Sequence, residues 1–116
     1  MRPDDRIRLQ HMLDAARKAA HFAEGRDRSD LEVDDLVAHG LVRLIEIVGE
    51  AAARVSVETR ADLPSLPWPA MVGMRNRLVH GYYEIDMDRV WDTLVHDLPP
   101  LIEALDRHLS HLPKDS

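Results

Sequence analysis

Residues 35–55 read DLVAHGLVRLIEIVGEAAARV and carry more apolar side chains than one helix face requires. One set follows the alternating steps of four and three that indicate an α-helix: Val37, Leu41, Leu44, Val48, Ala51 and Val55. A second set widens the apolar surface: Leu36, Ile45, Ile47 and Ala52. A helix that is apolar on several sides is buried on several sides, so this stretch predicts the centre of a helical bundle or a dimer face. Gly49 costs about 1 kcal/mol relative to alanine inside a helix, and we expect it to admit a neighbouring backbone.

A first helix is predicted over residues 4 to about 24. Asp4 and Asp5 suit the positive end of a helix dipole, and Gly25 suits a helix end. Alanine occupies three of the five positions on its apolar stripe, which implies close approach to another helix; the stripe is Leu9, Leu13, Ala16, Ala20 and Ala23. A charged connector follows, with a short turn expected at 29–32.

Two further helices are predicted after residue 55. Ser56 is expected to cap a short turn through Arg60, and Trp68 to anchor the proline-rich loop that follows. The third main helix is predicted from Pro69 to His80. The last runs from Met87 to about Leu109, and its apolar rhythm continues through Pro99-Pro100 without a change of phase. We therefore expect one bent helix there, or two coaxial helices.

These elements predict an all-α antiparallel bundle of four main helices. At 116 residues the chain has the length of one domain, assigned to 1–112 with a frayed tail at 113–116. It contains no cysteine, which excludes disulfides, and no run approaches the length of a membrane span. The N-terminus has no apolar signal region, so we expect no membrane partner and a cytoplasmic location. The formal charge of −6 predicts few phosphate contacts if the chain handles RNA.

The candidate functional residues lie in residues 74–83, which read MRNRLVHGYY. Arg75 and Arg77 offer forked donors suited to phosphate oxygens. His80 is the side chain here whose ordinary pKa allows proton transfer near neutral pH. On a continuous helix Asn76 and His80 would lie one turn apart on one face, with Gly81 ending the helix. A solvated helix end is an equally good interpretation of this spacing.

The order of these residues resembles a known signature. Residues 75–82 resemble the R-N-x-L-x-H-x-Y motif of HepT-like toxins in the HEPN superfamily. Residues 44–52, LIEIVGEAA, resemble that family's L-E-I-I-G-E-A-A helix, and Leu66-Pro67-Trp68 with 73–76 resembles its P-W-x-x-I-x-G-M-R-N segment. Val90-Trp91 and 97–99 resemble its last helix. The matching segments cover most of the chain in the family's order and spacing.

The resemblance implies a toxin that cleaves RNA without a metal or other cofactor. RNA can be cut when its own 2′-OH attacks the adjacent phosphate, which requires a base, an acid and cations. The motif contains one histidine in each chain, which is too few for both proton transfers, and a symmetric homodimer supplies two. The resemblance implies such a dimer, in which His80 transfers protons and Arg75 holds the phosphate. Asn76 orients one of these two side chains. Arg77 is a supporting residue that the family motif does not specify.

The resemblance also implies a protein partner. HepT-like toxins are typically paired with a minimal nucleotidyltransferase antitoxin, which in systems of this type can attach AMP to the tyrosine of H-x-Y, here Tyr82. A bulky anion two residues from His80 would obstruct the cleft and compete for its arginines.

Other functions and sites remain as alternatives. The chain could be a non-catalytic module that binds a nucleotide or RNA, or a structural helical protein that makes only protein contacts. His108 and His111 have a spacing compatible with two metal ligands, but no third ligand accompanies them, so no metal site is predicted. Glu46 and Glu50 are one turn apart and are expected to pair with Arg43 and Arg54 on a solvated face.

Overall fold

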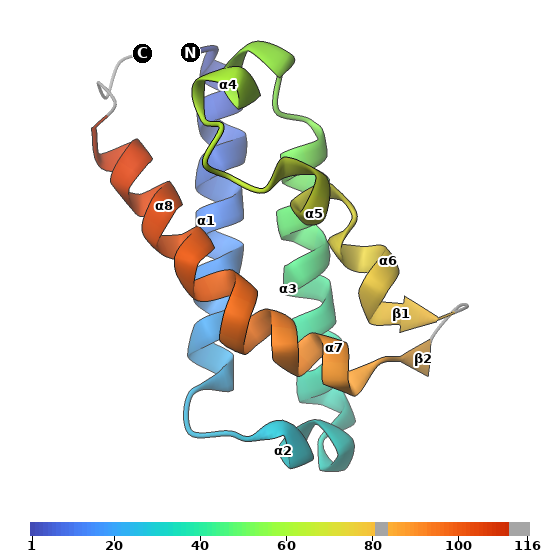
Figure 1. The fold of residues 1–116 in the computed structure, drawn as a ribbon. Coiled ribbons are helices and arrows are strands. Elements are labelled where there is room, and N and C mark those ends of the chain that lie inside the picture. Colours follow the sequence, from blue (N-terminus) through green and yellow to red (C-terminus); the bar gives the residue numbers. More distant parts are fainter. Residues whose placement is uncertain (81–83, 112–116) are drawn as a thin grey trace.

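Two long helices form the centre of the protein (Figure 1). The computed structural model describes residues 1–80 and 84–111, and at positions 75, 77, 79 and 80 it describes the backbone only. α1 (Pro3–Ala23) and α3 (Asp35–Ala53) run antiparallel, and α2 (Arg28–Val33) turns the chain between them. α1 has the predicted bounds to within one residue. Gly25 follows it with φ 73°, a left-handed conformation that glycine adopts without strain.

The interface between α1 and α3 is made largely of small and aliphatic side chains. The fully buried members include Leu9, Met12, Ala16 and Ala19 on α1 and Ala38, Leu41, Ile45 and Ala52 on α3. The predicted close approach through alanine is confirmed at Ala16, whereas Ala20 and Ala23 are only partly buried. Leu36 was expected to widen the buried surface of α3, but it is 83% exposed because it lies in the first turn, beyond the helices that cover α3.

The last helical segment covers one side of this pair. α7 (Met87–Asp92), the π-helical turn η1 (Thr93–Asp97) and α8 (Leu98–Ser110) form one continuous bent run that crosses α1 (Figure 1). The expected bent helix is therefore confirmed. Its buried residues keep the helical rhythm: Val90, Leu94, Leu98, Leu101 and Leu105. Asp86 is the N-cap, as predicted, because its side chain accepts a hydrogen bond from the Arg89 N–H at 3.1 Å.

The connection from α3 to this run begins as predicted. Ser56 caps the short helix α4 (Val57–Asp62) by accepting a hydrogen bond from the Thr59 N–H. Trp68 is 8% exposed, and its indole N–H donates to the Leu63 carbonyl at 3.0 Å. The tryptophan therefore anchors the proline-rich loop, because burial of the ring is combined with a satisfied polar group.

The predicted third main helix over Pro69–His80 is wrong in its extent. The structure divides this stretch into α5 (Trp68–Val72) and α6 (Met74–Leu78), separated at Gly73. Two-residue strands β1 (Val79–His80) and β2 (Glu84–Ile85) follow and pair antiparallel, although no strand was expected. The helix ends at Leu78 because the Leu78 carbonyl accepts the Asp86 N–H at 2.8 Å, which turns the chain into the hairpin.

Helices thus dominate the described residues, but one of the four main helices is replaced by two short ones and a hairpin. The predicted tail at 113–116 lies outside the described residues. In residues 1–80 and 84–111, no helix combines the length and apolar character that crossing a membrane requires. The bundle leaves α5, α6 and the hairpin on the flank of α3, away from α1 (Figure 1).

Candidate functional site

A close backbone contact with α3 positions the segment that carries the motif. A Cβ atom built on Gly49 would lie 2.9 Å from the Met71 carbonyl oxygen and 3.7 Å from that of Val72. Real Cβ contacts are essentially never as short as 2.9 Å, so only glycine allows α5 to lie this close. The expected use of Gly49 is confirmed.

α6 is held to the core by two side chains one turn apart. Met74 is 3% exposed and Leu78 is fully buried. Between these anchors Asn76 is exposed, and the backbones of residues 75 and 77 flank it on the same short helix. Because the anchoring side chains are apolar, the polar residues of α6 are not required to hold the helix on the core.

The hairpin after α6 determines where His80 lies. In the β1–β2 register, Val79 pairs with Ile85 and His80 with Glu84. His80 is therefore on a strand and not on the helix that carries Asn76, so the predicted placement of these two residues one helical turn apart is wrong. The physical reason is the long-range Asp86–Leu78 hydrogen bond, which competes successfully with continuation of the helix.

The predicted site residues therefore stand in two adjacent elements. Arg75, Asn76 and Arg77 lie on α6, and His80 lies on β1 directly after it. Tyr82, and Gly81 as the predicted helix end, lie outside the described residues. The backbone brings the arginine and histidine positions into one continuous segment at the flank of α3 (Figure 1).

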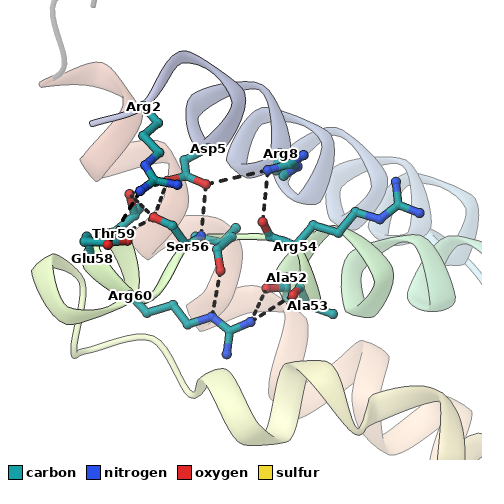
Figure 2. Close-up of polar contacts among 11 residues, drawn as sticks. Arg2, Asp5, Arg8, Ala52, Ala53, Arg54, Ser56, Glu58, Thr59 and Arg60 are labelled. Carbon is teal, nitrogen blue, oxygen red and sulfur yellow. Dashed lines mark hydrogen bonds and ion pairs between the residues drawn. The ribbon is translucent and has the colours of Figure 1, made fainter.

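A buried carboxylate to which the sequence assigned no site lies where the start of α1 meets α4 (Figure 2). Asp5 is 1% exposed and accepts hydrogen bonds from the Ser56 N–H at 3.0 Å, the Ser56 hydroxyl at 2.5 Å and the Thr59 hydroxyl at 2.7 Å. We call this set of three residues the Asp5 clasp. It joins the start of α1 to the cap of α4, which are 51 residues apart in sequence.

The hydrogen bonds of the Asp5 clasp determine its ionisation. Burial by itself favours the neutral acid, but the hydrogen bonds from Ser56 and Thr59, with a smaller attraction from Arg2, outweigh it and hold the pKa of Asp5 below its usual value. Arg60 completes this end by donating to the carbonyls of Ala52, Ala53 and Val55, which caps the C-terminus of α3 (Figure 2). These contacts stabilise a helix junction and form no open site.

The predicted pairing of Glu46 and Glu50 with arginines is confirmed for one of the two arginines. Arg43 forms ion pairs with Glu46 at 3.4 Å and Glu50 at 3.1 Å, whereas Arg54 forms no ion pair within the described residues. The expected solvated face holds for Arg43 and Glu50, but the Glu46 side chain is only 18% exposed. Within residues 1–80 and 84–111, no three His, Asp or Glu side chains are grouped so that they could hold a metal ion.

Depressions on the surface occur away from the motif as well as beside it. A groove of about 320 Å³ between α1 and α3 is lined by Ile7, Arg8, His11 and Arg54, among others, and includes none of the predicted site residues. A smaller cavity of about 190 Å³ lies between α5 and the η1–α8 turn, and Met74 of α6 forms part of its wall. The sequence predicted neither, because each combines residues distant in the chain.

Comparison with known proteins identifies a family that this chain resembles over most of its length. Residues 12–108 match a family described as ribonuclease HepT-like. The chain is 30% identical over 93 residues to a Methanocaldococcus jannaschii protein named "Putative RNase MJ1380", an alignment that covers 80% of this chain and 85% of that protein. It is 28% identical over 93 residues to the "Probable ribonuclease HepT" of Thermococcus cleftensis, covering 80% and 84% of the two chains.

A third relative differs in length. Over 115 residues the chain is 27% identical to a longer M. jannaschii protein named "Gamma-glutamylcyclotransferase and putative RNase MJ0434", and this covers 99% of the chain but 52% of that protein. No solved structure matches the chain. Because a family model matches residues 12–108 and relatives align along most of the chain, this protein belongs to the ribonuclease HepT-like family.

Proposed function

We propose that this protein is a metal-independent endoribonuclease and the toxin of a HEPN/MNT-type toxin–antitoxin system. The observation that carries the proposal is the R-N-x-L-x-H-x-Y motif at 75–82 within a chain that belongs to the ribonuclease HepT-like family. The exposure of Asn76, on a helix anchored by apolar residues, supports a functional use of this segment. Because its substrate is cellular RNA, we place the protein in the cytoplasm.

The proposed reaction is an internal transesterification. The 2′-oxygen forms a bond to the adjacent phosphorus while the bond from phosphorus to the 5′-oxygen breaks. The products are a 2′,3′-cyclic phosphate and a 5′-hydroxyl. One group removes the proton from the 2′-OH, another donates a proton to the departing 5′-oxygen, and cations stabilise the phosphate as charge develops. We assign the proton transfers to His80 and the phosphate contact to Arg75. Asn76 orients one of these two side chains, and Arg77 is a supporting residue.

The two proton transfers require two histidines, and we propose that a second copy of the chain supplies the other. In a two-fold dimer, the same surface of each protomer forms the interface, so one Arg75 and one His80 from each would line a composite cleft. The position of α6 and β1 on the flank of α3, instead of between α1 and α3, supports this arrangement (Figure 1).

The proposed control of this activity is covalent. A nucleotidyltransferase antitoxin would transfer AMP from ATP to the Tyr82 hydroxyl: the tyrosine oxygen bonds to the α-phosphorus and pyrophosphate leaves. The added adenylate would lie two residues from His80, where its negative charge competes with RNA for the arginines. Intact mass after incubation with ATP and the antitoxin should increase by one adenylate for the parent protein and not for Tyr82→Phe.

Digestion of RNA in the presence of a chelator, followed by analysis of the new ends, tests the proposed reaction. We expect cyclic phosphate and 5′-hydroxyl ends from the parent protein, and loss of cleavage in His80→Ala and in Arg75→Ala when both are shown to be folded. Cleavage by both variants at the parent rate would refute the assignment. RNA binding without cleavage by the parent, unaffected by His80→Ala, would instead identify a non-catalytic binding module.

A further inference from the structure

The 190 Å³ cavity beside α6 has a lining that suits a flat, uncharged ring. Its walls are mostly apolar and come from α5, α6, α8 and the residue before α5: Pro67, Ala70, Met71, Met74, Pro100 and Leu101. Pockets for drug-sized ligands usually have volumes of about 300–1,000 Å³. The smaller volume here accommodates a single ring system, with the rest of the molecule outside.

Two polar side chains stand at this cavity: a carboxylate, which accepts hydrogen bonds when ionised, and an imidazole, which both donates and accepts. Asp97 and His96 from η1 complete the lining, and both are exposed to solvent. Asp97 stands at the N-cap position of α8 but accepts no capping hydrogen bond there, so its carboxylate is not used to end the helix. Nε2 of His96 lies 3.6 Å from the carboxylate of Asp92, a residue outside the lining, so Asp97 supplies the carboxylate of the cavity.

Two prolines in the first turn of α8 leave backbone carbonyls of the preceding turn without their usual N–H donors. In an α-helix the carbonyls of Val95 and His96 would accept hydrogen bonds from residues 99 and 100, but both are prolines and have no N–H. The chain responds with a π-helical turn, in which the Leu98 N–H donates to the Thr93 carbonyl five residues before it. The Val95 and His96 carbonyls therefore lack their α-helical donors, and His96 is the one of these two residues that lines the cavity.

The Asp97 carboxylate beside apolar walls disfavours phosphate and favours a neutral group with N–H donors. Nucleobases have this chemistry: an apolar face, and amino groups on adenine, cytosine and guanine that can donate to a carboxylate. Uracil has no amino group and presents two carbonyl oxygens, so it is a poorer partner for the Asp97 carboxylate. The cavity adjoins the proposed phosphate-binding segment, because Met74 in its wall is followed directly by Arg75.

We propose that this cavity is a nucleobase subsite, which receives the base of a nucleotide next to the cleaved phosphate and prefers amino-bearing bases to uracil. The proposal rests on RNA being the substrate. Arg75 and the cavity then divide the recognition of one nucleotide: the cationic segment takes the phosphate, and the acidic apolar cavity takes the base.

Two substitutions in the lining test the subsite without touching the proposed catalytic residues. Ala70→Leu fills the cavity from an exposed position on α5, and Val72→Leu is its matched control, because Val72 is exposed on the same helix but does not line the cavity. Asp97→Asn removes the carboxylate. Its control is Glu103→Gln, an exposed carboxylate on α8 outside the cavity.

Each variant would be compared with the parent in two measurements. The first is the base composition beside the cut in an RNA of random sequence. The second is the affinity for uncleavable 2′-O-methyl hexamers of A, C or U, measured by fluorescence anisotropy. We expect the parent to cut beside uracil least and to bind the A and C hexamers more tightly than U. Ala70→Leu and Asp97→Asn should weaken A and C binding about tenfold, the effect of losing one base contact, and the controls about twofold or less.

The two measurements separate this inference from the proposed nuclease function. Cleavage with a base preference that both lining variants leave unchanged would refute the subsite and leave the nuclease intact. Hexamer binding that the lining variants weaken, in a parent protein that does not cut RNA, would support the subsite and refute the nuclease. A parent that neither cuts RNA nor binds any hexamer would overturn both.

Discussion

The α1–α4 junction and the flank that carries α6 use polar residues in opposite ways. In the Asp5 clasp, a carboxylate that is almost fully buried receives three hydrogen bonds from Ser56 and Thr59 and ties two helices together. In α6, apolar anchors hold the helix and Asn76 is exposed. The comparison indicates that the polar groups of the clasp serve stability, whereas Asn76 is open to solvent and is not needed to hold α6 on the core. Substitutions in the Asp5 clasp should therefore mainly lower stability, whereas substitutions in the motif should mainly lower activity.

The largest effect is expected on activity, from His80→Ala. Removing a general acid or base typically lowers the rate by about 10² to 10⁴-fold. The free energy of unfolding, measured by urea denaturation, should change by less than about 1 kcal/mol. If His80→Ala unfolds more easily than Asp5→Ala, or cuts RNA at the parent rate, the contrast between the motif and the Asp5 clasp is contradicted.

Asp5→Ala should have the largest effect on stability. It removes the acceptor of three hydrogen bonds in a buried place, where loss of a charged partner costs about 3 kcal/mol. Asp4→Ala is the matched control, since Asp4 is the exposed acidic neighbour in the same first turn and shares its interaction with the helix dipole. Urea denaturation should separate the two variants clearly, and RNA cleavage by the folded fraction of Asp5→Ala should persist.

The clasp also predicts a pH dependence. Because the pKa of Asp5 is lowered by folding, its contribution is complete well above the pKa of an unfolded aspartate, about 3.9, and is lost as the pH falls through the lower folded value. The parent protein should lose more stability between pH 5 and pH 2 than Asp5→Asn does. Parallel stability–pH curves for the two proteins would show that the carboxylate is not the group responsible.

Gly49→Ala should lower both the stability and the activity of the protein. The added methyl group would lie 2.9 Å from the Met71 carbonyl, so α5 must move, at a cost of about 2 kcal/mol. RNA cleavage should fall with it, because α5 leads directly into α6. The control is Gly40→Ala on the same helix: a Cβ there meets nothing within 4 Å, and the gain in helix propensity should stabilise the protein by about 0.5–1 kcal/mol.

The smallest effect is expected from an ion pair outside both regions. Arg17 and Asp106 join α1 to α8 at 2.7 Å, but both side chains are about half exposed. Exposed pairs contribute about 0.2–1 kcal/mol. Thermal unfolding of Arg17→Ala should therefore differ from the parent by a few degrees at most, and a larger loss would mean that the pair is more than a surface contact.

The sequence by itself determined the features that depend on local periodicity and helix ends. The span of α1, the bent run from Met87, the caps at Ser56 and Asp86 and the close approach at Gly49 were all predicted, because each depends on neighbouring residues or on the geometry of one glycine. The motif at 74–83 was also recognisable from its order alone.

Only the tertiary structure decided where long-range contacts override local preference. The predicted helix to His80 ends early because the Leu78 carbonyl bonds to Asp86, and Asp5 is buried because Ser56, 51 positions away, receives it. The cavity beside Met74 exists because α5 and the η1–α8 turn meet in space. Such contacts join residues that are distant along the chain, and local patterns in a single sequence do not reveal which distant residues will meet.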